Sequence, residues 1–202
     1  TDEEIIKRAE EKVAELKKTI AIEWTDKNIF PKEDNPVSVF MAGSPGAGKT
    51  ESAKRIIQLR SAKKPIIHLD PDEIRKQFDD YDGDNAELFQ TATSHVLSRM
   101  HDLVLDNGQS FIFDSTLSYY NKAVENIDRS LKPVRNRAVF VIYVYQDPLQ
   151  AWKFVQARKG VEGRKVPKYA FIEGYFSAKD TVNKLVKKYQ DKIFFEAIVK
   201  DI

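Results

Sequence analysis

The chain has 202 residues and no cysteine, which excludes disulfide bonds and thiolate metal sites. Its 33 basic and 31 acidic residues leave a net charge of +2, too balanced to favour a nucleic-acid or membrane surface. No apolar stretch approaches the roughly 20 residues of a membrane-spanning helix, and the start "TDEEIIKRAEEK" lacks the apolar core of a signal peptide. We therefore expect one cytoplasmic domain over residues 1–202, with no membrane partner and no nucleic acid.

Residues 1–36 are expected to form an N-terminal helix and a loop. Apolar residues recur every three or four positions, at Ile5, Ile6, Ala9, Val13, Leu16, Ile20 and Trp24, and "TDKNIFPKEDNP" follows as the loop. The apolar stripe needs a partner surface, so we expect the helix to pack against the rest of the chain. The alternative is that this helix is an inhibitory element or forms part of a surface that binds a protein partner.

Residues 37–202 alternate between strand and helix patterns. Short apolar runs predict strands at 37–42, 65–69, 109–113, 138–145 and 192–199. Helical patterns lie between them, at about 49–60, 71–79, 85–106, 119–131, 148–159 and 168–188. This order predicts an α/β fold with an open, mostly parallel five-stranded sheet and helices on both faces. We expect the second strand to lie next to the first.

The stretch "GSPGAGKT" follows the first predicted strand and opens the next helix, as a phosphate-binding P-loop does. The nucleotide-binding residues that it predicts are Gly43, Ser44, Pro45, Gly46, Ala47, Gly48, Lys49 and Thr50, together with Ser52. In this motif the backbone N–H groups cradle phosphate, the lysine reaches the β- and γ-phosphates, and the threonine hydroxyl binds Mg²⁺. The sequence therefore predicts a fold of the P-loop NTPase type with ATP and Mg²⁺ as cofactors.

Two acids follow the second strand, in "HLDPDEIRKQF". Ligands of open α/β sheets bind beyond the carboxyl ends of the strands, where a carboxylate can accept a proton from an acceptor hydroxyl or hold a metal. We predict that Asp72 is the catalytic base. Asp70 is expected to cap the helix that begins at Pro71 or to lie on the metal side. His68 is expected to be a packed strand residue.

The third strand ends in "FIFDSTLS", which places Asp114 at a strand terminus, as in a Walker B acid that holds Mg²⁺. Ser115 and Thr116 add hydroxyl groups over the same edge of the sheet. The alternative is that Asp114 begins a turn and caps the next helix. The predicted metal ligands are thus Thr50, Asp70 and Asp114.

Near the end of the chain, "ARKGVEGRKVP" at 157–167 places Arg158 and Arg164 around two glycines. A glycine-containing loop with two arginines can close over a triphosphate and stabilise the transferred charge, so we predict a catalytic lid here. A charge run of this kind can also be an ordinary solvated surface.

Together, "GSPGAGKT", "LDPDEIRKQF", "DNGQSFIFDST" and "QARKGVEGRKVP" resemble the zeta toxins, P-loop kinases of bacterial toxin–antitoxin systems, over about residues 37 to 175. The resemblance implies phosphorylation of the 3′-hydroxyl of the amino sugar in UDP-N-acetylglucosamine, and an antitoxin that blocks the ATP site. It also implies that Asp72 is the base, that Asp114, Ser115 and Thr116 form the substrate segment, and that Arg158 and Arg164 are the lid arginines.

This sequence departs from the family pattern on the side that binds the sugar nucleotide. The family often has Glu-Gly-Thr followed by an arginine, where this chain has Asp114, Ser115, Thr116 and then Leu117 and Ser118. A substrate-contacting glutamate expected on the preceding helix falls near Ser98. The predicted substrate-binding residues are therefore Asp72, Asp114, Thr116 and Ser98. Two alternatives remain: a P-loop kinase of another metabolite, an antibiotic or a polynucleotide end, and an ATP-binding interaction module without catalysis.

Overall fold

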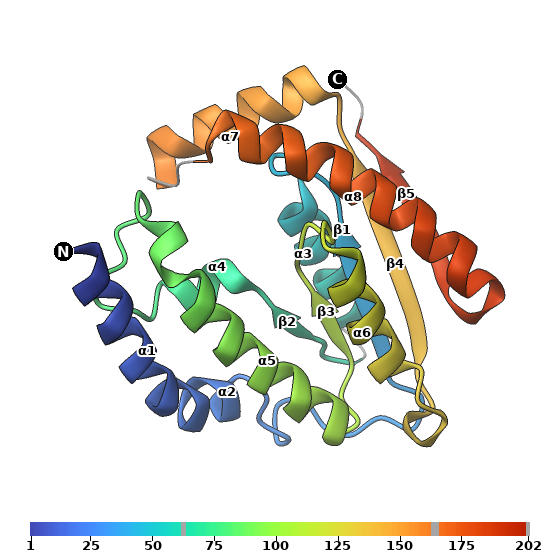
Figure 1. Ribbon diagram of the computed structural model, residues 1–202. Coiled ribbons are helices and arrows are strands. Elements are labelled where there is room, and N and C mark those ends of the chain that lie inside the picture. The colour runs from blue at the N-terminus through green and yellow to red at the C-terminus, as the bar shows by residue number, and fades with distance from the viewer. Residues whose placement is uncertain (62–63, 163–165, 201–202) are drawn as a thin grey trace.

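The computed structural model describes residues 1–61, 64–162 and 166–200 (Figure 1). Its centre is a parallel sheet in the order β2-β3-β1-β4-β5. The strands are β1 (Val37–Ala42), β2 (Ile67–Leu69), β3 (Phe111–Phe113), β4 (Ala138–Tyr145) and β5 (Phe194–Val199). The predicted α/β fold with a parallel five-stranded sheet is therefore confirmed.

The predicted strand order is wrong at one place, because β3 lies between β2 and β1. Phe111 of β3 is in register with Ser38 of β1 on one side and with Ile67 of β2 on the other. Three-residue apolar strands carry no sequence signal that selects a neighbour, so chain order alone misplaced β2. The end of β3, where Asp114 lies, therefore separates the acids that follow β2 from the P-loop that follows β1.

The helices cover both faces of the sheet. They are α1 (Asp2–Lys18), α2 (Ile20–Glu23), α3 (Lys49–Ser61), α4 (Pro71–Arg75), α5 (Gln90–Asp106), α6 (Tyr120–Ser130), α7 (Pro148–Glu162) and α8 (Lys168–Tyr189), with 3₁₀ turns η1 (Ala86–Phe89), η2 (Pro133–Arg135) and η3 (Gln190–Lys192). None of these helices, in the described part of the chain, has the length and apolar character to cross a bilayer.

Two helical predictions need correction. The first helix is broken at Thr19, whose φ of −99° and ψ of −83° leave the helical region, so α1 and α2 are separate. The expected lid loop is helical at its start, because α7 continues to Glu162. A single glycine in a helix costs only about 1 kcal/mol, and no proline interrupts 157–162, so the helix propagates.

Residues of β1 alternate between the two faces of the sheet. Phe40 packs among buried residues of α1, α5, α6 and α8, whereas Val39 and Met41 pack with residues of α3. The larger cluster also holds Ala9, Val13 and Leu16 of α1. The apolar stripe of the N-terminal helix therefore packs against the chain's own core, next to α5 (Figure 1).

Candidate active site

The P-loop turn lies between the end of β1 and the start of α3, packed directly against α7. Gly46 has a φ of +75°, and a Cβ built on it would come within 2.2 Å of the backbone oxygen of Ala151. Gly43, with a φ of +141°, is similarly close to the backbone oxygen of Val144. Only glycine fits these two positions, because a side chain would be strained there and would collide with main chain.

The side chains of the P-loop are held by the loop itself. Lys49 Nζ donates to the carbonyl oxygens of Gly43 at 3.0 Å and Ser44 at 2.8 Å. Ser52 Oγ donates to the carbonyl oxygen of Gly48 at 3.0 Å, which ties the first turn of α3 to the loop. The lysine ammonium group therefore lies over the turn, where it can attract an anionic phosphate.

Asp114, at the end of β3, meets the P-loop threonine. Thr50 Oγ1 donates to Asp114 Oδ2 at 2.9 Å, and His68 Nε2 lies 3.4 Å from the same oxygen. Burial alone would raise the pKa of the Asp114 carboxyl, but the His68 ring, the Lys49 charge and the Thr50 hydroxyl outweigh it and lower that pKa. Asp114 is thus a buried carboxylate that stays ionised beside the phosphate-binding turn.

Asp70 ends β2 and caps α4. Its Oδ1 accepts a hydrogen bond from the backbone N–H of Asp72 at 2.8 Å, so the predicted capping role is confirmed. Burial and repulsion from the carboxylates of Asp114 and Asp72 raise the pKa of Asp70, although the nearby His68 opposes this. The predicted metal-ligand oxygens of Thr50, Asp70 and Asp114 gather at one edge of the sheet, as Mg²⁺ coordination would require.

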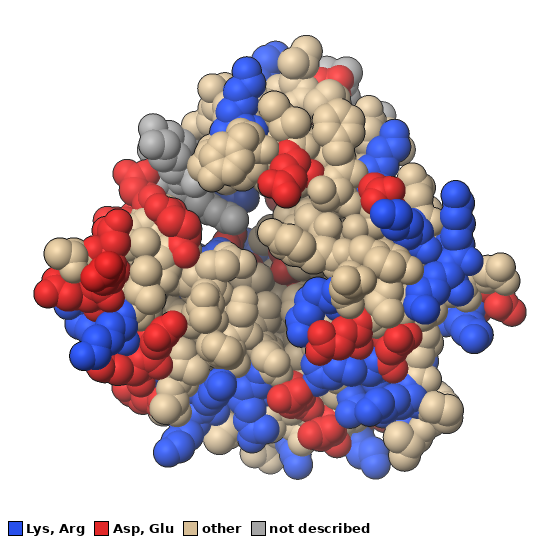
Figure 2. Space-filling model, viewed as in Figure 1, with Lys and Arg blue, Asp and Glu red and all other residues tan. Residues whose placement is uncertain are grey.

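Asp72 is held between two arginines. It accepts a short hydrogen bond from Arg75 of α4, and Arg158 of α7 lies 3.7 Å from its other oxygen. Arg75 is only 7% exposed and also donates to Gln90 at the start of α5. The Asp72–Arg158 pair joins α4 to α7. The face shown in Figure 2 is hollowed between α5 and the helices α7 and α8. Arg164, the second predicted lid arginine, lies outside the described residues.

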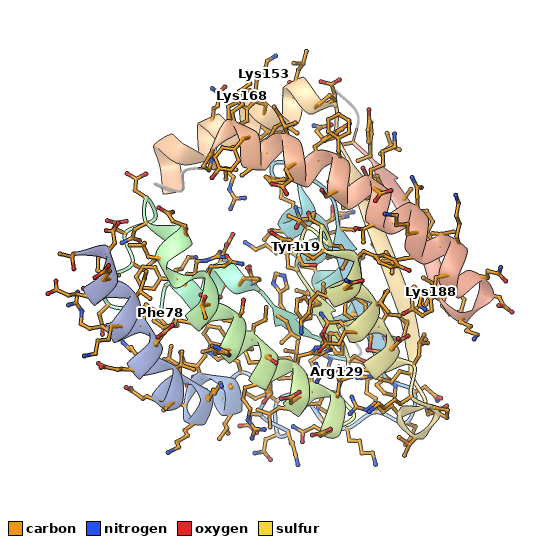
Figure 3. The ribbon with its side chains drawn as sticks, viewed as in Figure 1. Phe78, Tyr119, Arg129, Lys153, Lys168 and Lys188 are labelled. Carbon is orange, nitrogen blue, oxygen red and sulfur yellow. The ribbon has the colours of Figure 1, made fainter. Side chains whose placement is uncertain are left out.

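The loop after β3 forms another wall of the P-loop. The backbone oxygen of Thr116 accepts from the N–H of Gly43 at 3.2 Å, and Thr116 Oγ1 accepts from Ser118 at 2.8 Å. Leu117 between them has a φ of +56°, an uncommon value for a residue with a side chain. Tyr119, the residue before α6, is 77% exposed (Figure 3). Thr116 is thus joined to the nucleotide side of the site.

Ser98 is not joined to this cluster by any contact described. It lies on the exposed side of α5, one helical turn from Asp102. Its predicted contact with substrate stays a prediction.

The sequence analysis did not predict the site contacts of three residues, Arg75, His68 and Lys200. Arg75 sits one turn after Asp72, a spacing that signals a helical ion pair but not a buried one. His68 was expected to be a packed strand residue, yet it also contacts Asp114. Lys200, just after β5, brings its Cε within 3.3 Å of a Cβ built on Gly48. No local motif signals that contact, because it joins residues 152 positions apart in the chain.

The sheet order, the glycine turn and the lysine, threonine and acid around it together define a P-loop kinase. A family model described as Zeta toxin matches residues 21–200. The chain therefore belongs to the zeta toxin family.

Similar proteins extend this comparison. The chain is similar in structure to the PezAT chromosomal toxin–antitoxin system of Streptococcus pneumoniae, at 15% identity and a TM-score of 0.69 over 91% of this chain and 76% of that one. It is also similar to the AvrRxo1-ORF1:ORF2 complex solved with ATP, at 13% identity and a TM-score of 0.65 over 99% of this chain and 62% of that one. At these low identities, the structural similarity shows that the proteins share a fold.

A sequence relative comes from a virus. The genome polyprotein of vesicular exanthema of swine virus is 28% identical in an alignment of 179 residues that covers 79% of this chain. The chain spans only 9% of the length of that polyprotein.

Proposed function

We propose that this chain transfers the γ-phosphate of ATP to a hydroxyl of a nucleotide-activated sugar, with the 3′-hydroxyl of UDP-N-acetylglucosamine as the acceptor. The observation that carries the proposal is the position of Asp72. Its carboxylate follows β2 just beyond the buried Asp70, is paired with Arg75 of the same helix and lies 3.7 Å from Arg158 of α7. A nucleotide-binding module without catalysis does not need a carboxylate placed in this way.

The residues divide the chemistry between them. The turn at 43–50 binds the triphosphate, and Lys49 neutralises charge on the β- and γ-phosphates. Thr50, Asp70 and Asp114 would hold Mg²⁺, which supplies further charge neutralisation when bound. Asp72 orients the acceptor hydroxyl and takes its proton as the new O–P bond forms and the bond to ADP breaks. Arg158 stabilises charge on the transferred group.

The two arginines beside Asp72 have different proposed roles. In the described arrangement each carboxylate oxygen of Asp72 is near a guanidinium group, which fixes the position of the carboxylate. The Arg158 contact is the longer of the two, at 3.7 Å. We therefore propose that Arg158 turns from Asp72 to the phosphates when nucleotide binds, while Arg75 keeps the base in place.

The experiment is a transfer assay with γ-labelled ATP, Mg²⁺ and a panel of nucleotide sugars and their parent sugars, followed by mass spectrometry of the products. We expect a single phosphate on the amino sugar of UDP-N-acetylglucosamine. Lys49→Ala should abolish transfer and keep the fold, because the ammonium group neutralises phosphate charge and lies outside the hydrophobic core, where it donates to the carbonyl oxygens of Gly43 and Ser44. Transfer at the wild-type rate by that variant, or a product on another acceptor, would refute the respective part of the proposal.

We further propose a protein antitoxin as partner, since the PezAT relative is a toxin–antitoxin system. Expression in a bacterium that builds its wall from UDP-N-acetylglucosamine should arrest growth, and the Lys49→Ala variant should be harmless at equal protein level. Growth that is equally normal with both proteins contradicts a toxin activity.

A further inference from the structure

Lys200, the residue after β5, places a second ammonium group beside the P-loop. Its backbone N–H donates to the carbonyl oxygen of Tyr145 at 3.0 Å, which continues the pairing of β4 with β5 by one residue. Its side chain reaches the last glycine of the turn, with Cε 3.3 Å and Nζ 3.7 Å from a Cβ built on Gly48. The main chain of Lys200 is therefore fixed to the sheet, and its side chain lies against the phosphate-binding turn.

The ammonium group of Lys200 is available to an anion. Lys200 is half-buried, and it makes no ion pair or side-chain hydrogen bond with another residue in the described part of the chain. By contrast, the ammonium group of Lys49 donates to two carbonyl oxygens of the P-loop. A cation that is held next to an anion-binding turn can form a charge-assisted hydrogen bond with the phosphate that enters the turn.

An acidic residue on the same side of the turn adds to the need for a cation. Glu51 belongs to the first turn of α3, and its Oε2 lies 3.4 Å from the Cβ position built on Gly48. Its negative charge opposes the binding of a phosphate in the turn. The ammonium group of Lys200 approaches the same glycine, so it offsets that repulsion.

The order of the strands indicates which part of a nucleotide Lys200 meets. β1, which leads into the P-loop, lies between β3 and β4. Asp114 follows β3 and Asp72 follows β2, so the proposed Mg²⁺ ligand and the proposed base place the γ-phosphate on that side of the turn. Lys200 follows β5, on the opposite side. It therefore faces the end of the triphosphate that remains on ADP after transfer.

We propose that Lys200 binds the α- and β-phosphates of the nucleotide and contributes to the affinity for both ATP and ADP. The inference rests on the proposed function, because it takes the triphosphate to be bound by the turn at 43–50. It adds a binding residue that lies outside the P-loop motif and reaches the turn from the far end of the sheet. Lys49 and Lys200 then approach the phosphates from different elements.

The test measures binding alone, by calorimetric titration of the full chain with ATP and with ADP in the presence of Mg²⁺ and without an acceptor. Lys200→Met keeps an unbranched stem over Gly48 and removes the charge. It should weaken the binding of ATP and of ADP by a similar factor of at least about ten, because one charge-assisted hydrogen bond is lost from each. Lys200→Arg keeps the charge and should bind both nucleotides within about threefold of wild type.

Lys192→Met is the matched control. Lys192 is an exposed lysine just before β5, and the parallel pairing of β5 with β4 places it at the edge of the sheet opposite the P-loop. This variant should leave both affinities unchanged. Circular dichroism establishes that the variants fold, and Lys200→Gln, which is also uncharged, takes the place of Lys200→Met if that variant does not.

Three results would overturn the inference alone, given that wild type binds both nucleotides. They are wild-type affinities in the uncharged variant, an equal loss in the uncharged variant and in Lys200→Arg, which would show that packing matters and charge does not, and a loss for ATP without a loss for ADP, which would place the lysine at the γ-phosphate. A wild-type chain that binds neither nucleotide would instead overturn the proposed function, and this inference with it.

Discussion

Asp72 differs from its neighbour Glu73 in what surrounds it, although both belong to α4. Asp72 contacts the guanidinium groups of Arg75 and Arg158, whereas Glu73 pairs with Lys76 on the surface. We expect Asp72→Asn to keep ATP affinity and to slow turnover by about 10²- to 10⁴-fold, the scale of general-base loss. Glu73→Gln is the matched control and should have near wild-type kinetics. Equal single-turnover rates for Asp72→Asn and wild type would remove Asp72 as the base.

His101 makes the stability of the fold sensitive to acid. Burial against Phe40, Phe111 and Phe113, together with the charge of Arg129, lowers its pKa from 6.5 to about 3. Between these values the unfolded chain binds a proton that the folded chain does not. His101 therefore leaves the free energy of unfolding unchanged above about pH 6.5. As the pH falls from 6.5 toward 3, the same group lowers that free energy by up to about 1.4 kcal/mol per pH unit.

The His101 prediction is checked by urea unfolding of wild type and His101→Gln between pH 7 and 4. The difference in unfolding free energy between the two proteins should move in favour of the variant as the pH falls, because glutamine does not titrate. Parallel pH profiles would show that His101 does not control the acid sensitivity.

At the scale of elements, two glycines lie where the P-loop turn packs against helices α7 and α8: Gly46 in the turn and Gly174 in α8. They differ in how closely the neighbouring atoms approach. A Cβ at Gly46 would meet the backbone oxygen of Ala151 at 2.2 Å and would need a positive φ. A Cβ at Gly174 of α8 would lie 3.3 Å from Pro45 Cδ, a tight contact that a small shift relieves. Gly46→Ala should therefore lower the melting temperature and abolish ATP binding.

Gly174→Ala is the companion variant and should be close to neutral, because the roughly 1 kcal/mol gained in helix propensity offsets the crowding. Thermal melting and ATP titration of both proteins provide the measurement. If both substitutions behave alike, the packing of α7 on the turn is not what restricts position 46.

Helix α1 contributes to the core through its buried side chains. Leu16 is 3% exposed and belongs to the main hydrophobic cluster, whereas Ile22 of α2 is 53% exposed. Leu16→Ala should cost about 2–5 kcal/mol in unfolding free energy, and Ile22→Ala should cost far less. An inhibitory role for the helix instead predicts that Leu16→Ala is stable and more active, so urea unfolding and turnover together separate the two interpretations.

The sequence predicted elements well where local chemistry decides them. β1 and β4 have the predicted bounds, because long apolar runs between turn signals leave little choice of register or length. Asp70 caps α4 as expected, since a cap is set by residues within one turn. The order of β2 and β3 was not predictable in this way, because pairing partners are chosen by the packing of the whole sheet.

In the candidate site, too, the features set by local sequence were predicted and the long-range contacts were not. The P-loop and the acids at the strand ends were predicted, because each is tied to a short motif and to a strand terminus. The contacts Arg75–Asp72 and His68–Asp114 were missed, since nothing local shows whether a charged or aromatic polar residue will be buried. The predicted lid segment at 157–167 is helical at its start, because the helical pattern of α7 weakens at Gly160 while the helix itself continues to Glu162.

Across the whole molecule, the α7 and α8 helices connect the two functional sides. Ala151 and Gly174 pack on the P-loop turn, and Arg158 reaches Asp72 on α4. The same pair of helices therefore contacts the P-loop turn and Asp72 of α4, to which we assign nucleotide binding and acceptor binding respectively. We expect a change at the turn to displace α7, because the turn lies directly against the main chain of Ala151.

That contact gives the protein a built-in optical reporter. Trp152 follows Ala151 directly and packs on Phe171 of α8 with ring centroids 5.1 Å apart, while the chain's other tryptophan, Trp24, packs against the core next to α2. We expect ATP to change the tryptophan emission of wild type and of Trp24→Phe, and to leave that of Trp152→Phe unchanged. A fluorescence titration would then read nucleotide binding without a label and without an acceptor, and a signal that survives only in Trp152→Phe would contradict the coupling between α7 and the turn.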